Sequence, residues 1–334
     1  MINIGIIGYG YWGPNLCRNF NLQQNAKLYA IAESKIERHK SIKDQFPSVK
    51  LYGSADEIIN DNQVDAIVIA TPVYSHFELA MKALKSGKHV MLEKPMTSNV
   101  KQAVKLIEVS ENLGLVLMVD HTFLYTAAVQ KIKEMIDSGV IGNLKYFDST
   151  RINLGLFQSD VNVLWDLAPH DISIILHLLK ERPFSVNATG ISHLNNGIED
   201  LAYLTLNYNN NMIAHFNCSW TSPVKVRQIL VGGDKKMILY NDIEPTEKLK
   251  VYDTSYAVSN DEEKFKFLID YRQGDILIPK ISNHEALFMV AKDFVASIVD
   301  SQRPLSDSHL GFEVVKILEA AEKSIKNNGK EIKL

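Results

Sequence analysis

Two side chains that can cooperate in acid–base chemistry lie four residues apart in the segment 165–172. Asp166 and His170 share one face if this segment is helical, because residues four apart are neighbours on a helix. A carboxylate beside an imidazole fixes its tautomer and stabilises its protonated form. This chemistry makes His170 a candidate general base, with Asp166 orienting it or contacting a substrate. On spacing alone, a capping aspartate and a structural histidine explain the same pair.

A metal site is the other chemistry that the dipeptide His170-Asp171 suggests. No further cluster of histidine and aspartate supports it in the sequence, and Cys17 and Cys218 stand alone, without the spacing of a zinc site. We therefore expect no metal.

Lys94 is a third candidate, in Glu93-Lys94-Pro95 just after an apolar run. Open α/β sheets bind their ligands at the carboxyl ends of parallel strands. A lysine there can take a proton from a hydroxyl group or polarise a developing oxygen anion. A surface lysine that happens to follow a strand is the alternative.

A glycine motif, Gly8-Tyr-Gly10-Tyr-Trp-Gly13-Pro14, ends the first apolar run. Gly8 permits a tight turn, Gly10 lets a pyrophosphate approach the backbone, and Gly13 allows close packing of helix on strand. Pro14 suits the first turn of a helix, whose amino-terminal amides attract phosphates. The motif predicts a dinucleotide site, and a glycine turn without a ligand is the alternative.

Glu33 supplies the carboxylate that this fingerprint requires about 20 residues further on. We expect it to bond the adenosine ribose and to repel the additional phosphate of NADP. Lys35 and Arg38 could bind that phosphate, but residues of this kind more often form a solvated helix face. NAD is therefore favoured over NADP.

The elements that must position these groups alternate between strands and helices in the first third of the chain, as in βαβ units. Runs that are apolar at every position indicate a parallel sheet covered on both faces. The expected strands are 3–7, 27–32, 66–70, 89–92 and 115–119, and the expected helices are 14–20, 75–86 and 99–112. We predict a doubly wound α/β Rossmann domain over residues 1–120.

The pattern changes after Asp120 to a helix and then long β-rich segments separated by polar turns. This pattern predicts an α+β domain over residues 121–334 with an open-faced, mainly antiparallel sheet. The expected helices are 127–138, 283–300 and 309–327, and the expected strands are 144–153, 186–193, 202–208, 212–220, 226–231, 237–240 and 249–252.

Composition narrows the class of protein. The 334 residues suit two domains, and 46% hydrophobic with 22% charged residues is ordinary for a globular protein. A net charge of -3 gives no basic patch for nucleic acid, and no apolar run is long enough to span a membrane. Met1 leads directly into a strand and the two cysteines are isolated, so we expect no signal peptide and a cytoplasmic location.

Several short motifs together resemble one family. They are the glycine motif, Ala70-Thr-Pro72 with His76, Glu93-Lys-Pro95 and Asp166-Leu-Ala-Pro-His-Asp171. The combination is similar to the glucose–fructose oxidoreductase and inositol 2-dehydrogenase family, Gfo/Idh/MocA, over nearly the whole chain. The resemblance implies a Rossmann domain, an open-faced second sheet and NAD-dependent oxidation or reduction of a sugar-like alcohol. It also favours the catalytic interpretation of Lys94, Asp166 and His170.

The resemblance further implies which residues contact the cofactor. Thr71, Pro72 and His76 resemble a loop that runs under it, and His121 follows the last Rossmann strand near the nicotinamide. Aromatic side chains at Tyr11, Trp12 and Trp165 could pack on cofactor or substrate, although buried aromatic residues usually belong to the core. The expected cofactor-binding set is Gly8, Gly10, Tyr11, Trp12, Gly13, Glu33, Ser34, Arg38, Thr71, Pro72, His76, Glu93, Lys94, His121 and Trp165.

Three segments, 8–16, 165–172 and 271–275, look like the nucleotide-sugar 3-dehydrogenase branch of this family. That branch acts on UDP-N-acetylglucosamine or its uronate in surface-polysaccharide pathways. A sugar diphosphate needs cations, so Arg151, with Asn153 and Asn162, is expected to bind substrate alongside Lys94, Asp166 and His170. Arg151 could equally pair a carboxylate of the protein.

Two other functions remain open on this fold: a ketosugar reductase that uses NADPH, and a regulator that senses the cofactor without catalysis. Retention of Lys94, Asp166 and His170 argues against the regulator. Apolar residues on both faces of strands 202–208 and 212–220 predict a homodimer or homotetramer, in which a second subunit covers one face of the sheet.

Overall fold

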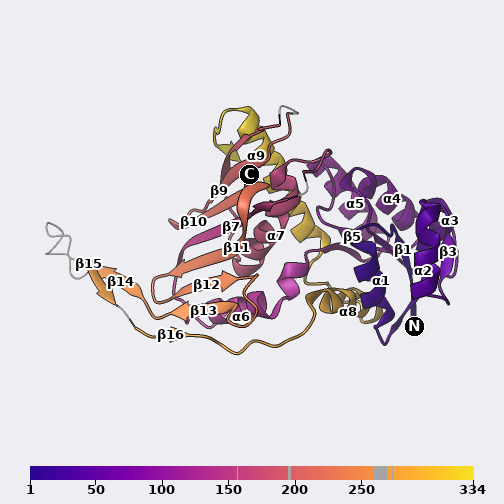
Figure 1. Cartoon of the computed structure of the whole chain (residues 1–334), viewed down its shortest axis with the longest axis horizontal. Helices are drawn as coiled ribbons and strands as arrows, with labels where there is room; N and C mark the ends of the chain where they lie inside the picture. Colours follow the sequence, from indigo (N-terminus) through magenta and orange to yellow (C-terminus); the bar gives the residue numbers. More distant parts are fainter. Residues whose placement is uncertain (156, 195–196, 259–268, 273) are drawn as a thin grey trace. The chain divides into compact units, whose positions relative to one another are not determined.

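The computed structural model describes residues 1–155, 157–194, 197–258, 269–272 and 274–334, with the backbone alone between 255 and 272. The chain divides into two compact units. The first contains Met1–Thr126 and His284–Lys316, and the second contains Ala127–Asn283 and Ile317–Leu334. The carboxyl-terminal segment therefore returns to the first unit before the chain ends in the second (Figure 1).

The first unit is built on a parallel sheet with the strand order β3-β2-β1-β4-β5-β6, as in a Rossmann fold. Its strands, in the part of the unit that the structure describes, are β1 (Ile2–Ile7), β2 (Ala26–Ala32), β3 (Lys50–Tyr52), β4 (Ala66–Ile69), β5 (His89–Glu93) and β6 (Leu117–Asp120). All four residues of β4 are buried, as expected for a sheet covered on both faces. The predicted doubly wound fold is confirmed.

Helices connect these strands, and two of them, α3 and α5, begin at a residue whose side chain caps the helix. The side chain of Asn99 accepts a hydrogen bond from the amide of Gln102 at the start of α5, and Ser54 does the same for Glu57 at the start of α3. The helical elements of this unit are α1 (Gly13–Asn21), η1 (Ile36–Arg38), α2 (His39–Gln45), α3 (Ala55–Ile59), η2 (Val73–Ser75), α4 (His76–Lys85), α5 (Val100–Asn112), η3 (Thr122–Tyr125) and α8 (Ala286–Val299).

A return of the chain at Ser306 extends the far edge of this sheet. The amide of Val119 on β6 donates to the carbonyl of Ser306, 3.0 Å away, and Ser306 Oγ donates back to the Val119 carbonyl. Hydrogen bonds across a sequence separation of 187 residues fix this segment to the first unit. A single boundary at residue 120, as predicted from the sequence pattern, does not anticipate this return.

The second unit is a mixed, mainly antiparallel sheet with the order β16-β13-β12-β11-β7-β10-β9-β8-β17 over the described residues. Strands β7 and β10 pair in parallel, and the other pairs are antiparallel. The strands are β7 (Leu144–Leu154), β8 (Ser185–Ile191), β9 (Leu201–Asn207), β10 (Ile213–Ser219), β11 (Thr221–Gly233), β12 (Met237–Asn241), β13 (Leu249–Tyr252), β16 (Ile276–Leu277) and β17 (Ile332–Lys333).

The helices that the structure describes in the second unit are α6 (Ala127–Asp137), α7 (Val163–Leu178) and the part of α9 (Ser308–Lys326) from Ile317 onward. Strands β14 (Ser255–Val258) and β15 (Ile269–Arg272) form a separate two-stranded ribbon. Among the described residues, no helix is both long and apolar enough to cross a membrane.

One face of the large sheet is buried and the other carries exposed apolar side chains. On β9, Leu204 and Leu206 are fully buried, whereas Tyr203 on the opposite face is 43% exposed. Ile213 on β10 and Leu230 on β11 lie on the same outward face and are 46% and 43% exposed. The open-faced architecture is confirmed, and the predicted second subunit on this face stays a prediction.

Candidate active site

The glycine turn between β1 and α1 contains three glycines, and a side chain at each position would meet different surroundings. A Cβ on Gly8, whose φ is +98°, would lie 2.6 Å from the Ala70 carbonyl oxygen. A Cβ on Gly13 would lie 2.4 Å from the Gly8 carbonyl oxygen, so this residue allows helix and turn to touch. A Cβ on Gly10 would meet nothing nearer than Arg38 Nη1, at 3.9 Å. Gly10 therefore borders open space, as a backbone that admits a pyrophosphate must.

Glu33, at the end of β2, is held by the glycine turn itself. Its Oε2 accepts hydrogen bonds from the Tyr9 amide at 2.8 Å and from Arg38 Nη1 at 3.1 Å, and its Oε1 accepts from the Lys35 amide at 2.8 Å. Burial raises the pKa of Glu33, but these bonds outweigh it and leave the pKa below its ordinary value. The residue is therefore an anion at neutral pH.

A cavity of about 730 Å³ in the first unit runs past these groups to Lys94. Its volume is in the range of cofactor sites. The predicted cofactor residues that line it are Gly8, Gly10, Tyr11, Trp12, Glu33, Ser34, Arg38, Thr71, Pro72, Glu93 and Lys94. An open glycine backbone, a carboxylate at the second strand and a lysine at the fifth fit a nicotinamide dinucleotide.

Several further lining residues were missed by the sequence analysis. Gly53 and Ser54 follow β3, and Tyr74, Ser75 and Leu79 lie on η2 and α4. Strand β3 has three residues, none of them buried, and this left no apolar signal in the sequence. The turn after it could not be placed beside the glycine motif without that strand.

His76 does not line the cavity; it supports two loops that do. Its ring is buried, with Nδ1 3.0 Å from the Pro95 carbonyl oxygen and Nε2 2.8 Å from the Thr71 carbonyl oxygen. The imidazole thus joins the loop after β4 to the loop after β5. Its predicted contact with the cofactor is replaced by this bridging position.

Glu93 and Asp120 are register partners at the carboxyl ends of β5 and β6. Asp120 is 2% exposed, and its Oδ1 and Oδ2 accept from Thr122 Oγ1 at 2.5 Å and Trp12 Nε1 at 3.5 Å. The adjacent His121 is fully buried, and within the described residues neither of its ring nitrogens has a hydrogen-bond partner. Burial, followed by the charge of Lys94, lowers the pKa of His121 to about 3, so that it stays neutral.

In the second unit, Asp166 and His170 lie one turn apart on α7, as their spacing predicts. Asp166 Oδ2 accepts a hydrogen bond from Trp220 Nε1, 3.0 Å away on the sheet side of the helix. Lys94 belongs to the first unit, and its convergence with these two groups stays a prediction from the resemblance. The three groups are a candidate base (His170), a carboxylate that could orient it (Asp166) and a cation (Lys94).

Two predicted site residues near the start of α7 make contacts within the protein, and their predicted roles stay predictions. Asn162 caps the helix, since its Oδ1 accepts from the Trp165 amide at 3.2 Å while its Nδ2 donates to Glu199 at 2.9 Å. The Trp165 indole is 6% exposed and donates to Glu322 on α9 at 3.2 Å. Asn153 lies partly buried near the end of β7, and its predicted contact with substrate stays a prediction.

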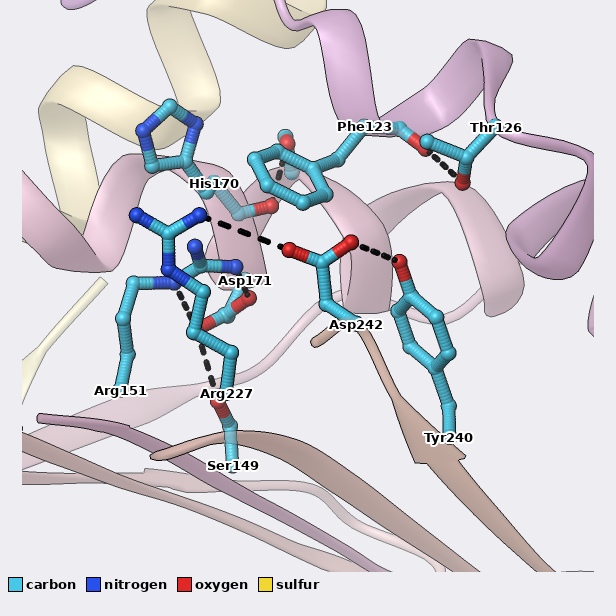
Figure 2. Close-up of polar contacts among 10 residues, drawn as sticks. Phe123, Thr126, Ser149, Arg151, His170, Asp171, Arg227, Tyr240 and Asp242 are labelled. Carbon is cyan, nitrogen blue, oxygen red and sulfur yellow. Dashed lines mark hydrogen bonds and ion pairs between the residues drawn. The ribbon is translucent and has the colours of Figure 1, made fainter. Parts of the chain in front are cut away.

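Arg151 is buried beneath α7 and bound to the protein's own carboxylate. Its Nε and Nη2 donate to the two oxygens of Asp171 at 2.9 and 2.7 Å, and Ser149 Oγ donates to Asp171 at 2.7 Å (Figure 2). A bidentate pair that is 5% and 2% exposed has no room for a diphosphate. The sequence left open whether Arg151 pairs a carboxylate or the substrate, and the structure places it on the carboxylate.

Arg227 is a cation that the sequence analysis missed. It sits directly opposite Arg151 in the pairing of β11 with β7, and therefore on the same face of the sheet. Its side chain is 35% exposed, and Nη1 lies 3.5 Å from Asp242 Oδ2, while the Tyr240 hydroxyl donates to Asp242 Oδ1 (Figure 2). Only the strand register could have revealed it, because Arg227 stands in an otherwise ordinary β-rich run.

Comparison with known proteins follows the same two-unit division. Residues 2–121 match a family model described as an oxidoreductase family with an NAD-binding Rossmann fold, and residues 129–239 match the GFO/IDH/MocA C-terminal domain. The motif 271–275 cannot be compared at side-chain level, since Gln273 and the side chains of Tyr271 and Arg272 lie outside the described residues.

Individual relatives are similar at low sequence identity. The 2,7-anhydro-N-acetylneuraminate hydratase of Escherichia coli is 26% identical over 75% of this chain and 70% of its own. The NADP-dependent scyllo-inositol 2-dehydrogenase of Bacillus subtilis is 26% identical over 72% of this chain and 69% of its own. The solved UDP-N-acetylglucosamine 3-dehydrogenase of Acidithiobacillus ferrooxidans superposes with a TM-score of 0.79 at 22% identity and 98% coverage of both chains.

Proposed function

The chain belongs to the Gfo/Idh/MocA oxidoreductase family, and from this premise we propose that it oxidises a secondary alcohol of a nucleotide sugar with NAD. The expected position is C-3 of a UDP-N-acetylhexosamine or its uronate. The observation that carries the proposal is the continuous cavity that extends from Glu33 past the glycine turn to Lys94. One ligand in that cavity would join the ribose anchor to the candidate catalytic lysine.

NAD rather than NADP is the proposed cofactor because of the charge at Glu33. The carboxylate is ionised and buried at the end of β2, where it would repel a ribose phosphate. Arg38, which could attract that phosphate, already donates to Glu33. When bound, the nicotinamide supplies the acceptor for the substrate hydride.

The proposed roles of the protein groups follow from their chemistry. His170 takes the hydroxyl proton on a ring nitrogen, since an imidazole is basic enough to do so at neutral pH. Asp166, held by the Trp220 indole, is in position on α7 to orient the imidazole or a substrate hydroxyl. Lys94 donates a hydrogen bond to the oxygen as its negative charge develops.

Arg227 is the proposed contact for the substrate's diphosphate. Arg151 is neutralised by Asp171 below the surface, whereas Arg227 beside it is partly exposed and holds Asp242 at the longer distance of 3.5 Å. A phosphate oxygen could therefore bond the Arg227 guanidinium without exposing a buried carboxylate. This reassignment keeps the predicted anionic substrate and changes the cation that meets it.

Cofactor titration followed by substrate screening tests the proposal. The purified protein is titrated with NAD and NADP by calorimetry, and then incubated with UDP-N-acetylglucosamine, its uronate, inositol and glucose. We expect NAD to bind more tightly than NADP. We also expect a nucleotide sugar to lose two hydrogens, while inositol and glucose stay unchanged. Preference for NADPH with reduction of a ketosugar would establish the reductase alternative. Binding without any turnover would establish the regulator.

A second copy of the chain is the proposed cover for the outward face of the large sheet. Tyr203, Ile213 and Leu230 expose apolar area there on three neighbouring or near-neighbouring strands. Light scattering should give the mass of a dimer or tetramer, and Leu230→Lys should shift it toward the monomer. A monomeric mass for the unaltered protein would contradict this assembly.

A further inference from the structure

Glu93 and Asp120 form a carboxyl pair that the proposed proton path does not use. They end adjacent parallel strands at matched positions, so their side chains leave the sheet on the same face, where Asp120 is 2% exposed and Glu93 Oε1 is buried. Two ionised carboxylates placed side by side away from water repel each other, which favours a proton on one of them. The geometry therefore indicates a pair that holds one proton and one negative charge.

The other contacts of the pair cannot replace that shared proton. The Lys94 amide donates to Glu93 Oε2 at 3.3 Å, while Thr122 and Trp12 donate to Asp120. These three neutral donors bond Glu93 Oε2 and the two oxygens of Asp120, and none of them bonds Glu93 Oε1. Glu93 Oε1 is buried without a hydrogen-bond partner among the residues that the structure describes. An ionised carboxylate would leave that oxygen poorly solvated, which favours the protonated form.

Charged neighbours set how firmly the pair holds its proton. Burial, then the charge of Asp120, raises the pKa of Glu93 well above its usual range, and burial also raises the pKa of Asp120. The charge of Lys94 acts in the opposite direction on both.

The remaining titratable groups of this unit that face the cluster keep a constant charge near neutral pH. Burial lowers the pKa of His76 and His121, so both stay neutral, and the Tyr125 hydroxyl is bonded to Asp293 at 2.6 Å with its pKa raised by burial. These neighbours therefore leave the carboxyl pair and Lys94 as the groups of this cluster that a change of charge in the adjacent cavity would act on.

We propose that Glu93 and Asp120 share one proton, release it to solvent when NAD⁺ binds, and regain it when the bound cofactor is reduced. The inference rests on the proposed function, because it places the nicotinamide end of the cofactor at the Lys94 end of the cavity that Glu93 lines. A positively charged ring there stabilises a second negative charge on the pair, and a neutral reduced ring does not. Binding of NAD⁺ therefore releases one proton to solvent, and binding of NADH releases none.

This linkage has a sign that can be measured. If binding of NAD⁺ releases a proton, then its affinity rises with pH by up to about tenfold per unit while the pair titrates. The affinity for NADH stays level over the same interval. The positive ring also repels Lys94, so the variants of Glu93 and Asp120 are needed to assign the released proton to the pair.

Calorimetric titration in two buffers of different ionisation enthalpy counts the protons released. The unaltered protein should release protons with NAD⁺ and not with NADH. Glu93→Gln and Asp120→Asn, which keep the size of each side chain and remove its titrating proton, should bind NAD⁺ without release. Asp44→Asn, an exposed carboxylate on α2, should behave as the unaltered protein does.

Three results decide the matter. Equal proton release with NAD⁺ and NADH, or undiminished release in a folded Glu93→Gln variant, would overturn the shared proton. Failure of the unaltered protein to bind either form would instead overturn the proposed function. If both variants fail to fold, an NAD⁺ affinity that does not change with pH in the unaltered protein would still overturn the proposal.

Discussion

The Glu33 carboxylate accepts a hydrogen bond from the Tyr9 amide, 2.8 Å away, so the end of β2 is tied to the glycine turn after β1. The same carboxylate also accepts from the Lys35 amide. A residue predicted from its spacing to meet the ribose thus also holds the turn that meets the pyrophosphate. Substitution of Glu33 should therefore affect both the ribose contact and the conformation of the glycine turn.

Glu33→Ala should weaken NAD binding and narrow the preference over NADP. It removes the negative charge that opposes a ribose phosphate, and it frees Arg38 to attract one. Dissociation constants for both cofactors, measured by calorimetry, test this. Glu37→Ala, an exposed neighbour, is the control and should change neither value. A preference for NADP in the unaltered protein would refute the role given to Glu33.

Gly10→Val should abolish cofactor binding while the protein stays folded. The nearest atom to a Cβ at this position is 3.9 Å away, so the side chain is accommodated but occupies the space expected for phosphate. Gly13→Ala, whose Cβ would lie 2.4 Å from the Gly8 carbonyl oxygen, should instead lower the melting temperature. If folded Gly10→Val bound NAD with undiminished affinity, the prediction that the pyrophosphate binds at this turn would be wrong.

Lys94→Met and His170→Asn should each reduce turnover by roughly 100-fold or more, the usual effect of losing an acid–base or oxyanion partner. NAD affinity should change little, because neither residue is needed at the adenosine half. Lys85→Met, an exposed lysine on α4, should leave turnover unchanged. Near-normal turnover in both variants would separate these residues from the chemistry.

Removal of the charge at Arg151 should lower stability, whereas removal of the charge at Arg227 should weaken substrate binding. Arg151→Met leaves Asp171 buried without its bidentate partner, which typically costs about 3–5 kcal/mol of unfolding free energy. Arg227→Met removes one long contact at the surface and should cost less than about 1 kcal/mol, yet it should raise the KM for a nucleotide sugar. Denaturant unfolding and steady-state kinetics on both variants measure the two effects. A stable Arg151→Met variant with a raised KM would return the substrate contact to Arg151.

Local patterns were sufficient to predict much of the structure. The apolar runs predicted five strands of the first sheet, and the spacing of Asp166 and His170 predicted their common face on α7. Such signals depend on neighbours in sequence. The buried partner of Arg151 depends instead on the packing of α7 against β7, and a lone arginine in a strand does not reveal it.

Long-range contacts were the part that the sequence could not show. Ser306 joins β6 through hydrogen bonds across most of the chain, and the short strand β3 is stabilised by pairing with β2 rather than by its own apolar pattern. For the same reason, Gly53 and Ser54 were absent from the predicted site, although they line the cavity.

Transfer of the substrate hydrogen is the most direct test of the proposed reaction. UDP-N-acetylglucosamine deuterated at C-3, and separately its uronate, are incubated with the protein and NAD, and the masses of cofactor and sugar are followed. We predict that one of them yields deuterated NADH and a 3-keto product without the label. Reduced cofactor without deuterium would place the oxidation at another carbon. Absence of reduction with both nucleotide sugars, together with turnover of inositol or glucose, would contradict the nucleotide-sugar assignment.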